Sequence, residues 1–130
     1  MASTVRKALI PAAGRGTRFL PLTKSVPKEL APIVTTPVIE FVVAEAARHG
    51  ISDVLLVLSE GKEAIEDYFG HDADLETALE KKGDAAGLAS IRRPGELARI
   101  SSVRQPEPRG LGDAVAQGRG FAGDEPLVVL

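Results

Sequence analysis

The sequence predicts an α/β fold with a largely parallel sheet that is covered by helices on both faces. Apolar residues make up 44% of the 130 residues, which is enough for a buried core. Short runs of aliphatic residues alternate along the chain with amphipathic segments. Alternating strands and helices indicate a parallel sheet, because the connection between two parallel strands usually contains a helix.

The first predicted strand is Val5 to Ile10, a short run of branched residues that is typical of a strand buried on both faces. Five prolines in residues 11–37 interrupt any helical pattern, so we predict a loop there. A loop of this length inside a compact domain is usually functional. A helix follows, for which we expect Thr36 as the cap, Pro37 in the first turn and His49–Gly50 at the end.

The remaining segments continue the alternation. Further strands are predicted at residues 53–58, 98–104 and 127–130. Helices are predicted between them, at residues 62–69, 75–82, 84–92 and 111–117. Gly87 weakens the third of these helices, because glycine disfavours a helix interior. The chain ends inside an apolar strand, so we expect a fold truncated at its fourth strand.

Composition and charge exclude several classes of protein. The formal net charge is −2, with acids and bases interspersed, so nucleic-acid binding by bulk charge is not expected. Aromatic residues make up only 4% of the chain, which argues against a base-stacking platform. There is no cysteine, which excludes disulfides and thiol catalysis. Without a signal peptide or a membrane-spanning segment, we expect a soluble, cytoplasmic protein that does not contact membranes.

The glycine-rich loop after the first strand is the strongest chemical signal. In α/β sheets, ligands bind outside the carboxyl ends of the strands, where this loop is expected. Small residues leave its main chain accessible to a base or a phosphate: Ala12, Ala13, Gly14 and Gly16. Hydroxyl and cationic side chains suited to phosphate oxygens follow: Thr17, Arg18, Lys24 and Lys28. The loop is therefore a candidate triphosphate site.

Two familiar phosphate-binding motifs do not fit this loop. A dinucleotide fingerprint needs a third glycine and an immediate helix, but Phe19 takes the glycine position and Pro21 interrupts the helix. A P-loop needs Gly-Lys-Ser or Gly-Lys-Thr, and no such string occurs. By itself, Gly-x-Gly after a strand is also compatible with a tight turn that binds nothing.

Longer strings carry more information. Residues 12–21 read Ala-Ala-Gly-Arg-Gly-Thr-Arg-Phe-Leu-Pro, and residues 23–29 read Thr-Lys-Ser-Val-Pro-Lys-Glu. Both resemble the signature of bacterial UTP–glucose-1-phosphate uridylyltransferases, with further similar strings at residues 31–34, 37–40, 61–69 and 103–114. The resemblance implies a three-layer, Rossmann-like nucleotide-diphospho-sugar transferase fold. Residues 1–130 would be the N-terminal nucleotide-binding half of one nucleotidyltransferase catalytic domain, with the C-terminal sugar-binding part absent.

The implied activity is the transfer of UMP from UTP to glucose 1-phosphate, which gives UDP-glucose and pyrophosphate by in-line attack on the α-phosphate. The resemblance implies that Arg18 and Lys28 are the catalytic cations. Fixed cations suit this reaction, because the two substrates are anions that repel each other. No general base is needed, since a phosphate monoester is already ionised near neutral pH.

The resemblance also implies how the nucleotide is held. The backbone of Ala13 and Gly14 would meet the uracil edge, with Glu29 nearby. The amide of Gln105 would hydrogen-bond uracil, and the backbone of Gly110 would face the base from the other side. The expected nucleotide-binding residues are Ala12, Ala13, Gly14, Gly16, Thr17, Glu29, Gln105 and Gly110.

The implied cofactor is Mg²⁺, with its main aspartate ligand beyond Leu130 and no metal ligand within this chain. The fragment alone is therefore expected to be inactive, and the full-length protein is expected to be a homo-oligomer. Two alternatives stay open: a sibling enzyme that uses dTTP or another sugar phosphate, and a non-catalytic nucleotide-binding fragment.

Overall fold

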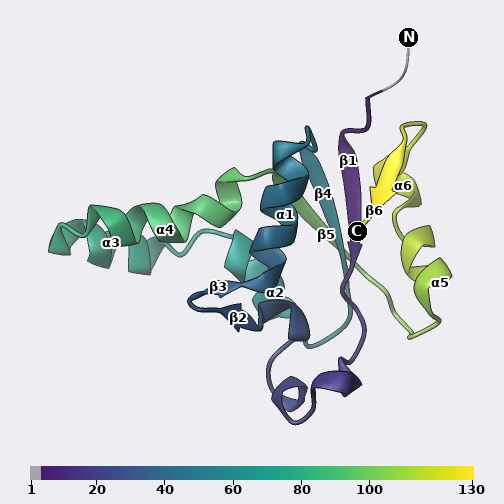
Figure 1. Ribbon diagram of the computed structural model, residues 1–130, viewed down its shortest axis with the longest axis horizontal. Helices are drawn as coiled ribbons and strands as arrows, with labels where there is room; N and C mark the ends of the chain where they lie inside the picture. Colours follow the sequence, from purple (N-terminus) through teal and green to yellow (C-terminus); the bar gives the residue numbers. More distant parts are fainter. Residues whose placement is uncertain (1–3) are drawn as a thin grey trace.

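A four-stranded parallel sheet forms the centre of the protein in the computed structural model, which describes residues 4–130 (Figure 1). The strands are β1 (Lys7–Pro11), β4 (Asp53–Leu58), β5 (Arg99–Arg104) and β6 (Leu127–Val129). Their order in the sheet is β5–β4–β1–β6. Leu9 of β1 lies in register with Leu55 of β4 on one side and Val129 of β6 on the other. The predicted α/β class and parallel sheet are confirmed.

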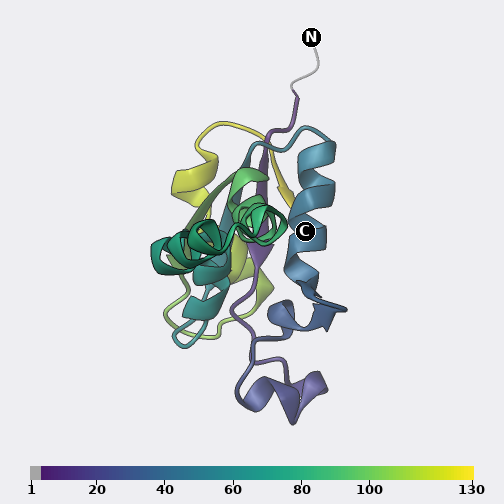
Figure 2. The same cartoon turned by 90° about the vertical axis from the view of Figure 1, so that its left-hand side faces the viewer.

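Helices cover both faces of this sheet, as Figure 2 shows. The helices are α1 (Val38–Arg48), α2 (Glu63–Phe69), α3 (Ala73–Lys82), α4 (Ala85–Glu96), α5 (Leu111–Ala116) and α6 (Arg119–Ala122). Helix α1 lies on one face, and the short helices α5 and α6 lie on the other. Helices α3 and α4 form a hairpin that projects from the sheet (Figure 1). Within residues 4–130, no helix is long and apolar enough to cross a membrane.

The alternation of side chains along the buried strands creates two apolar layers. Ala8, Ile10 and Leu56 face one side and pack with α1 and α2. Leu9 and Leu55 face the other side and pack with residues of α5 and α6. Strands β1 and β4 are therefore buried on both faces, which explains why their sequences are nearly continuous apolar runs.

The predicted loop at residues 11–37 contains no α-helix but is more ordered than a plain loop. It holds three short 3-10 helices, η1 (Thr17–Phe19), η2 (Leu22–Lys24) and η3 (Lys28–Leu30), and the antiparallel pair β2 (Pro32–Ile33) and β3 (Thr36–Pro37). The expectation that this segment is wholly non-helical was wrong in this respect. A 3-10 turn needs only a few residues, so it fits between prolines that would interrupt an α-helix.

The predicted start of α1 was also wrong in detail. Pro37 is the N-cap residue, and Thr36 makes no capping hydrogen bond because it pairs with Ile33 in the small hairpin. The N–H of Val38 instead donates to the carbonyl of Ala31, at 3.0 Å. The hairpin thus satisfies a helix N–H that a threonine side chain was expected to satisfy.

Two further boundaries differ from the prediction. Strand β1 begins at Lys7, where its ladder with β4 and β6 begins, and not at Val5. Helix α4 continues past the predicted end at residue 92 to Glu96. At its other end, Asp84 caps the helix by accepting the N–H of Gly87 at 2.9 Å. Gly87 therefore lies in the first turn, where its missing side chain makes room for the cap. Helix α6 was not predicted, since four residues are too few to show a helical period.

Candidate functional site

A cavity of about 950 Å³ opens at the carboxyl edge of the parallel sheet. Three loops line it, and each follows a strand: residues 13–15 follow β1, residues 59–62 follow β4, and residues 105–108 follow β5. The three strands are neighbours in the sheet. The cavity therefore lies where α/β proteins bind their ligands.

The glycine-rich loop has a defined shape at this edge. Gly16 has a positive φ of 65°, which glycine adopts without strain. The hydroxyl of Thr23 donates to the carbonyl of Gly16 at 2.7 Å, so the loop folds back on itself. The hydroxyl of Ser59 donates to the carbonyl of Ala13 at 2.8 Å and joins this loop to the one after β4.

The structure brings only some of the predicted residues to the cavity wall. Ala13, Gly14, Thr17 and Gln105 line the cavity. Ala12 is buried beneath it, where its N–H extends the sheet to the carbonyl of Val57 at 2.8 Å. The structure does not bring the other predicted residues to the wall: Gly16, Arg18, Lys28, Glu29 and Gly110.

The loop carries a positive charge that nothing in it neutralises. Residues 11–37 contain four cations, Arg15, Arg18, Lys24 and Lys28, and a single carboxylate, Glu29. Within residues 4–130, Glu29 is paired with Lys62, and none of the four loop cations has a carboxylate partner. All four are exposed. This concentration of positive charge beside a cavity favours an anionic ligand.

The ion pair between Glu29 and Lys62 is buried. Nζ of Lys62 lies 2.9 Å from Oε1 and 3.3 Å from Oε2 of Glu29, and each residue is 8% exposed. The pair joins η3 to the turn after β4. Glu29 therefore reaches the cavity only through Lys62, which lines the wall.

Gln105 lies at the wall in a fixed orientation. Its Nε2 donates to Oδ2 of Asp113 at 2.9 Å and to the carbonyl of Gly110 at 3.2 Å. Gly110, which was expected to face a base, contacts Gln105 through this carbonyl.

The loop after β4 was given no role by the sequence, yet Ser59, Glu60, Gly61 and Lys62 all line the cavity. The carboxylate of Glu63 accepts the N–H of Gly61 at 3.2 Å, which helps to shape this turn. Backbone hydrogen bonds, first with its own amide and then with Gly61, lower the pKa of Glu63. The signal for this loop was available: it follows a buried strand, as the glycine-rich loop does.

The described residues do not form a metal site. Within residues 4–130, no group of three or more histidines or carboxylates is placed to hold a metal ion. The residues described thus do not fit a resident metal by themselves.

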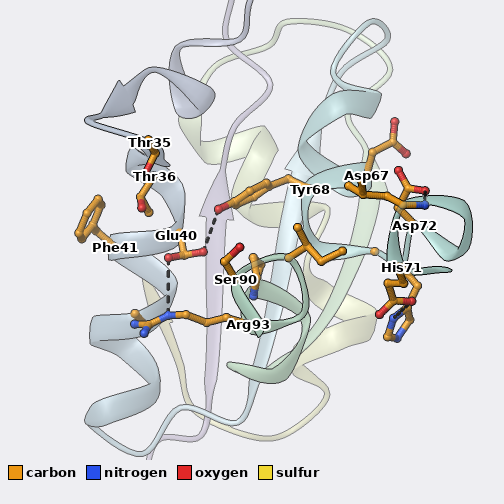
Figure 3. A pocket seen from close by; sticks show the side chains of 16 residues that line it. Thr35, Thr36, Glu40, Phe41, Asp67, Tyr68, His71, Asp72, Ser90 and Arg93 are labelled. Carbon is orange, nitrogen blue, oxygen red and sulfur yellow. Dashed lines mark hydrogen bonds and ion pairs between the residues drawn. The ribbon is translucent and has the colours of Figure 1, made fainter. Parts of the chain in front are cut away.

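A second cavity, of about 590 Å³, lies between α1, α2 and the α3–α4 hairpin. Figure 3 shows Glu40 at one end, between Tyr68 and Arg93. The Tyr68 hydroxyl donates to Oε1 of Glu40 at 2.8 Å, and Nε of Arg93 lies 3.7 Å from Oε2. Burial raises the pKa of Tyr68, and the hydrogen bond to Glu40 raises it further. Four carboxylates line this cavity, Glu40, Asp67, Asp72 and Glu76, together with one arginine, Arg93.

Fold and site together define an α/β protein with an anion-attracting cavity at the carboxyl edge of its sheet. Residues 7–130 match the family model described as Nucleotidyl transferase. The chain belongs to this nucleotidyl transferase family.

Individual relatives agree with this assignment. The chain is 51% identical over 126 residues to the UTP–glucose-1-phosphate uridylyltransferase of Bacillus subtilis, which covers 97% of this chain and 43% of that protein. A solved structure of a UTP-bound UGPase from Acinetobacter baumannii is similar, with 45% identity and a TM-score of 0.93 over 97% of this chain and 45% of that chain. A UDP-glucose pyrophosphorylase complexed with UDP-glucose has 41% identity and a TM-score of 0.78, over 97% of this chain and 44% of that chain. The chain thus spans less than half the length of each.

Proposed function

We propose that this chain provides the nucleotide-binding side of a UTP–glucose-1-phosphate uridylyltransferase, in which residues 1–130 form one half of a single catalytic domain. The observation that carries the proposal is the glycine-rich loop at the end of β1, with four exposed cations that have no carboxylate partner in residues 4–130. The names of the relatives support UTP and a glucose phosphate as the substrates.

The proposed reaction transfers UMP. An oxygen of glucose 1-phosphate attacks the α-phosphorus of UTP, the bond from that phosphorus to the bridging oxygen breaks, and pyrophosphate leaves with the electron pair. No proton has to move. Arg18 and Lys28 would reduce the repulsion between the two anions and stabilise the charge that develops on the leaving group.

The loop geometry suits the binding step. The bare main chain at Ala13 and Gly14 leaves room for a flat base, and Thr17 adds a hydroxyl at the same wall. Lys24 also lines the cavity. The loop therefore offers N–H groups, a hydroxyl and cations to one nucleotide.

Family membership favours a requirement for a divalent metal ion in general. We propose Mg²⁺ as that ion. Because residues 4–130 contain no cluster that could hold it, no step above is assigned to the metal. The homo-oligomer and the cytoplasmic location stay predictions.

Binding and turnover test the proposal separately. Calorimetric titration of this chain with UTP, dTTP, ATP and NAD should show binding of UTP, and a preference for NAD would contradict the proposal. In the complete gene product, Lys28→Ala should lower UDP-glucose formation by about a hundredfold or more. Lys81→Ala, which removes an exposed cation at the end of α3, is the matched control and should leave turnover unchanged.

A sibling enzyme that uses dTTP is the second candidate. Such an enzyme would also need cations and a loop of small residues, so the cavity alone does not distinguish a UTP enzyme from a dTTP enzyme. The calorimetric titration distinguishes them, because tighter binding of dTTP than of UTP would favour the dTTP enzyme.

A further inference from the structure

The side-chain amide of Gln105 has its nitrogen and its oxygen in different surroundings. The backbone N–H of the same residue donates to the carbonyl of Leu58 at 2.7 Å, so Gln105 continues the pairing of β5 with β4. Its side chain lies at the cavity wall, although the residue is only 7% exposed. The side-chain nitrogen, Nε2, faces the start of α5, where Asp113 and Gly110 accept its hydrogen bonds.

The chemistry of these two partners fixes which way the amide points. A carboxylate and a backbone carbonyl accept hydrogen bonds and have no proton to donate. If the amide turned over, Oε1 of Gln105 would face two acceptors, and Asp113 would lose the hydrogen bond that it accepts from Gln105. The amide NH₂ must therefore face Asp113 and Gly110.

The other end of the amide remains for a ligand. Within residues 4–130, no donor reaches Oε1 of Gln105, and no buried side-chain oxygen lacks a hydrogen-bond partner. Oε1 is therefore accessible, and the cavity presents an acceptor at this point. A ligand that meets Gln105 here must supply a donor.

The turn before α5 holds this arrangement in place. Gly110 has φ 91° and ψ −178°, a conformation that glycine adopts readily. Its carbonyl also accepts the N–H of Ala114 at 3.1 Å, so the turn is tied to the first turn of the helix. Asp113 lies in that same first turn.

We propose that Asp113 is a positioning residue that determines which base the cavity accepts. By holding the Gln105 NH₂ group, it leaves Oε1 to select a base whose ring N–H lies between two carbonyls, as in uracil or thymine. Cytosine has an acceptor at that ring position, so two acceptors would face each other. The inference rests on the proposed function, because it assumes that a nucleobase lies against Gln105.

Calorimetry with Asp113→Asn tests the proposal. An asparagine amide both donates and accepts, so Gln105 becomes free to turn over and to accept either base. The ratio of the Kd values for CTP and UTP should fall by about tenfold relative to the wild-type chain. Glu107→Gln is the matched control, since it removes a carboxylate that pairs with Arg109 on the same loop. That control should keep the wild-type ratio.

The outcomes separate this inference from the proposed function. A wild-type chain that does not bind UTP contradicts both. A folded Asp113→Asn chain with the wild-type ratio of Kd values overturns the inference alone.

If the variant does not fold, nuclear magnetic resonance of the wild-type chain decides. The two Nε2 protons of Gln105 should keep their chemical shifts and their protection from solvent exchange when UTP binds. A large shift of these protons on UTP binding, of the kind caused by donation to the base, would overturn the inference.

Discussion

Nζ of Lys62 lies 2.9 Å from Oε1 of Glu29, and this contact joins two loops that are 33 residues apart in the sequence. The pair holds η3, which contains Lys28, against the turn that follows β4. Because Lys62 neutralises the one carboxylate in residues 11–37, the positive charge of the glycine-rich loop remains available for a ligand.

Removing one partner of this pair should destabilise the protein. Glu29→Gln leaves the charge of Lys62 buried without its counter-ion, which typically costs about 3–5 kcal/mol. Urea unfolding measures the loss. The double substitution Glu29→Met with Lys62→Met should recover much of it, because apolar side chains carry no charge to desolvate. A Glu29→Gln chain with wild-type stability would show that the pair is not buried as described.

Two glycines of the same loop should respond differently to alanine. Gly16 has a positive φ, and an added Cβ would lie 2.9 Å from Cγ2 of Thr23, so Gly16→Ala should lose about 1–2 kcal/mol of stability or more. Gly14 has no atom within 4 Å of an added Cβ and lines the cavity, so Gly14→Ala should keep its stability and bind UTP less tightly. Thermal unfolding and calorimetry measure these effects. Equal stability of the two variants would contradict the described loop.

The contact between the sheet and α6 can be tested with a second pair of glycine-to-alanine substitutions. At Gly118, an added Cβ would collide with Cδ1 of Leu9, so Gly118→Ala should cost about 1–3 kcal/mol by overpacking. Gly120→Ala, within α6, meets no atom within 4 Å and should be neutral or slightly stabilising. Denaturant unfolding compares the two, and a neutral Gly118→Ala would mean that α6 does not pack on Leu9.

Tyr68 should make stability depend on pH in the alkaline range. Burial and the hydrogen bond to Glu40 raise its pKa in the folded state, while Arg93 lowers it to a lesser extent. The folded protein therefore holds the phenol proton more tightly than the unfolded chain does. This contribution is complete below the ordinary tyrosine pKa of about 10 and is lost as the pH rises towards the folded-state value.

The measurement compares the free energy of unfolding at about pH 8 and about pH 11, on either side of the ordinary tyrosine pKa. Tyr68→Phe should be less affected by the rise in pH than the wild-type chain. Tyr68 is the only tyrosine, so the ultraviolet absorbance of tyrosinate follows its ionisation directly. Ionisation near the ordinary pKa would contradict the buried contact with Glu40.

Local sequence patterns predicted those helices and strands well whose bounds depend on neighbouring residues alone. Strand β4 has the predicted bounds, and α3 ends at Lys82 as predicted, followed by Gly83 in the left-handed conformation. The start of α1 was missed because a hydrogen bond from Val38 to Ala31 replaces the expected cap. A contact made through the β2–β3 hairpin leaves no trace in the local sequence around Thr36.

The same limit applies to the candidate site. Ala13, Gly14, Thr17 and Gln105 were predicted as nucleotide-binding residues, and all four line one cavity; their role in binding stays a prediction. The loop at residues 59–62 lines the same cavity and received no role. Only Lys62 of this loop was assigned, to the predicted helix at residues 62–69, and the position of β4 between β1 and β5 is set by the sheet.

By itself, the sequence determined that the protein has an α/β fold and that a loop of small and cationic residues follows its first strand. Both features can be read from neighbouring residues, because they depend on the spacing of hydrophobic residues and on local composition. Only the tertiary structure decided that Lys62 neutralises Glu29 and that Asp113 orients Gln105. The first contact joins two loops that lie 33 residues apart in the sequence, and the second joins the two ends of the connection between β5 and α5. The sequence pattern indicates which residues can take part in binding, but the tertiary structure determines which of them are in contact.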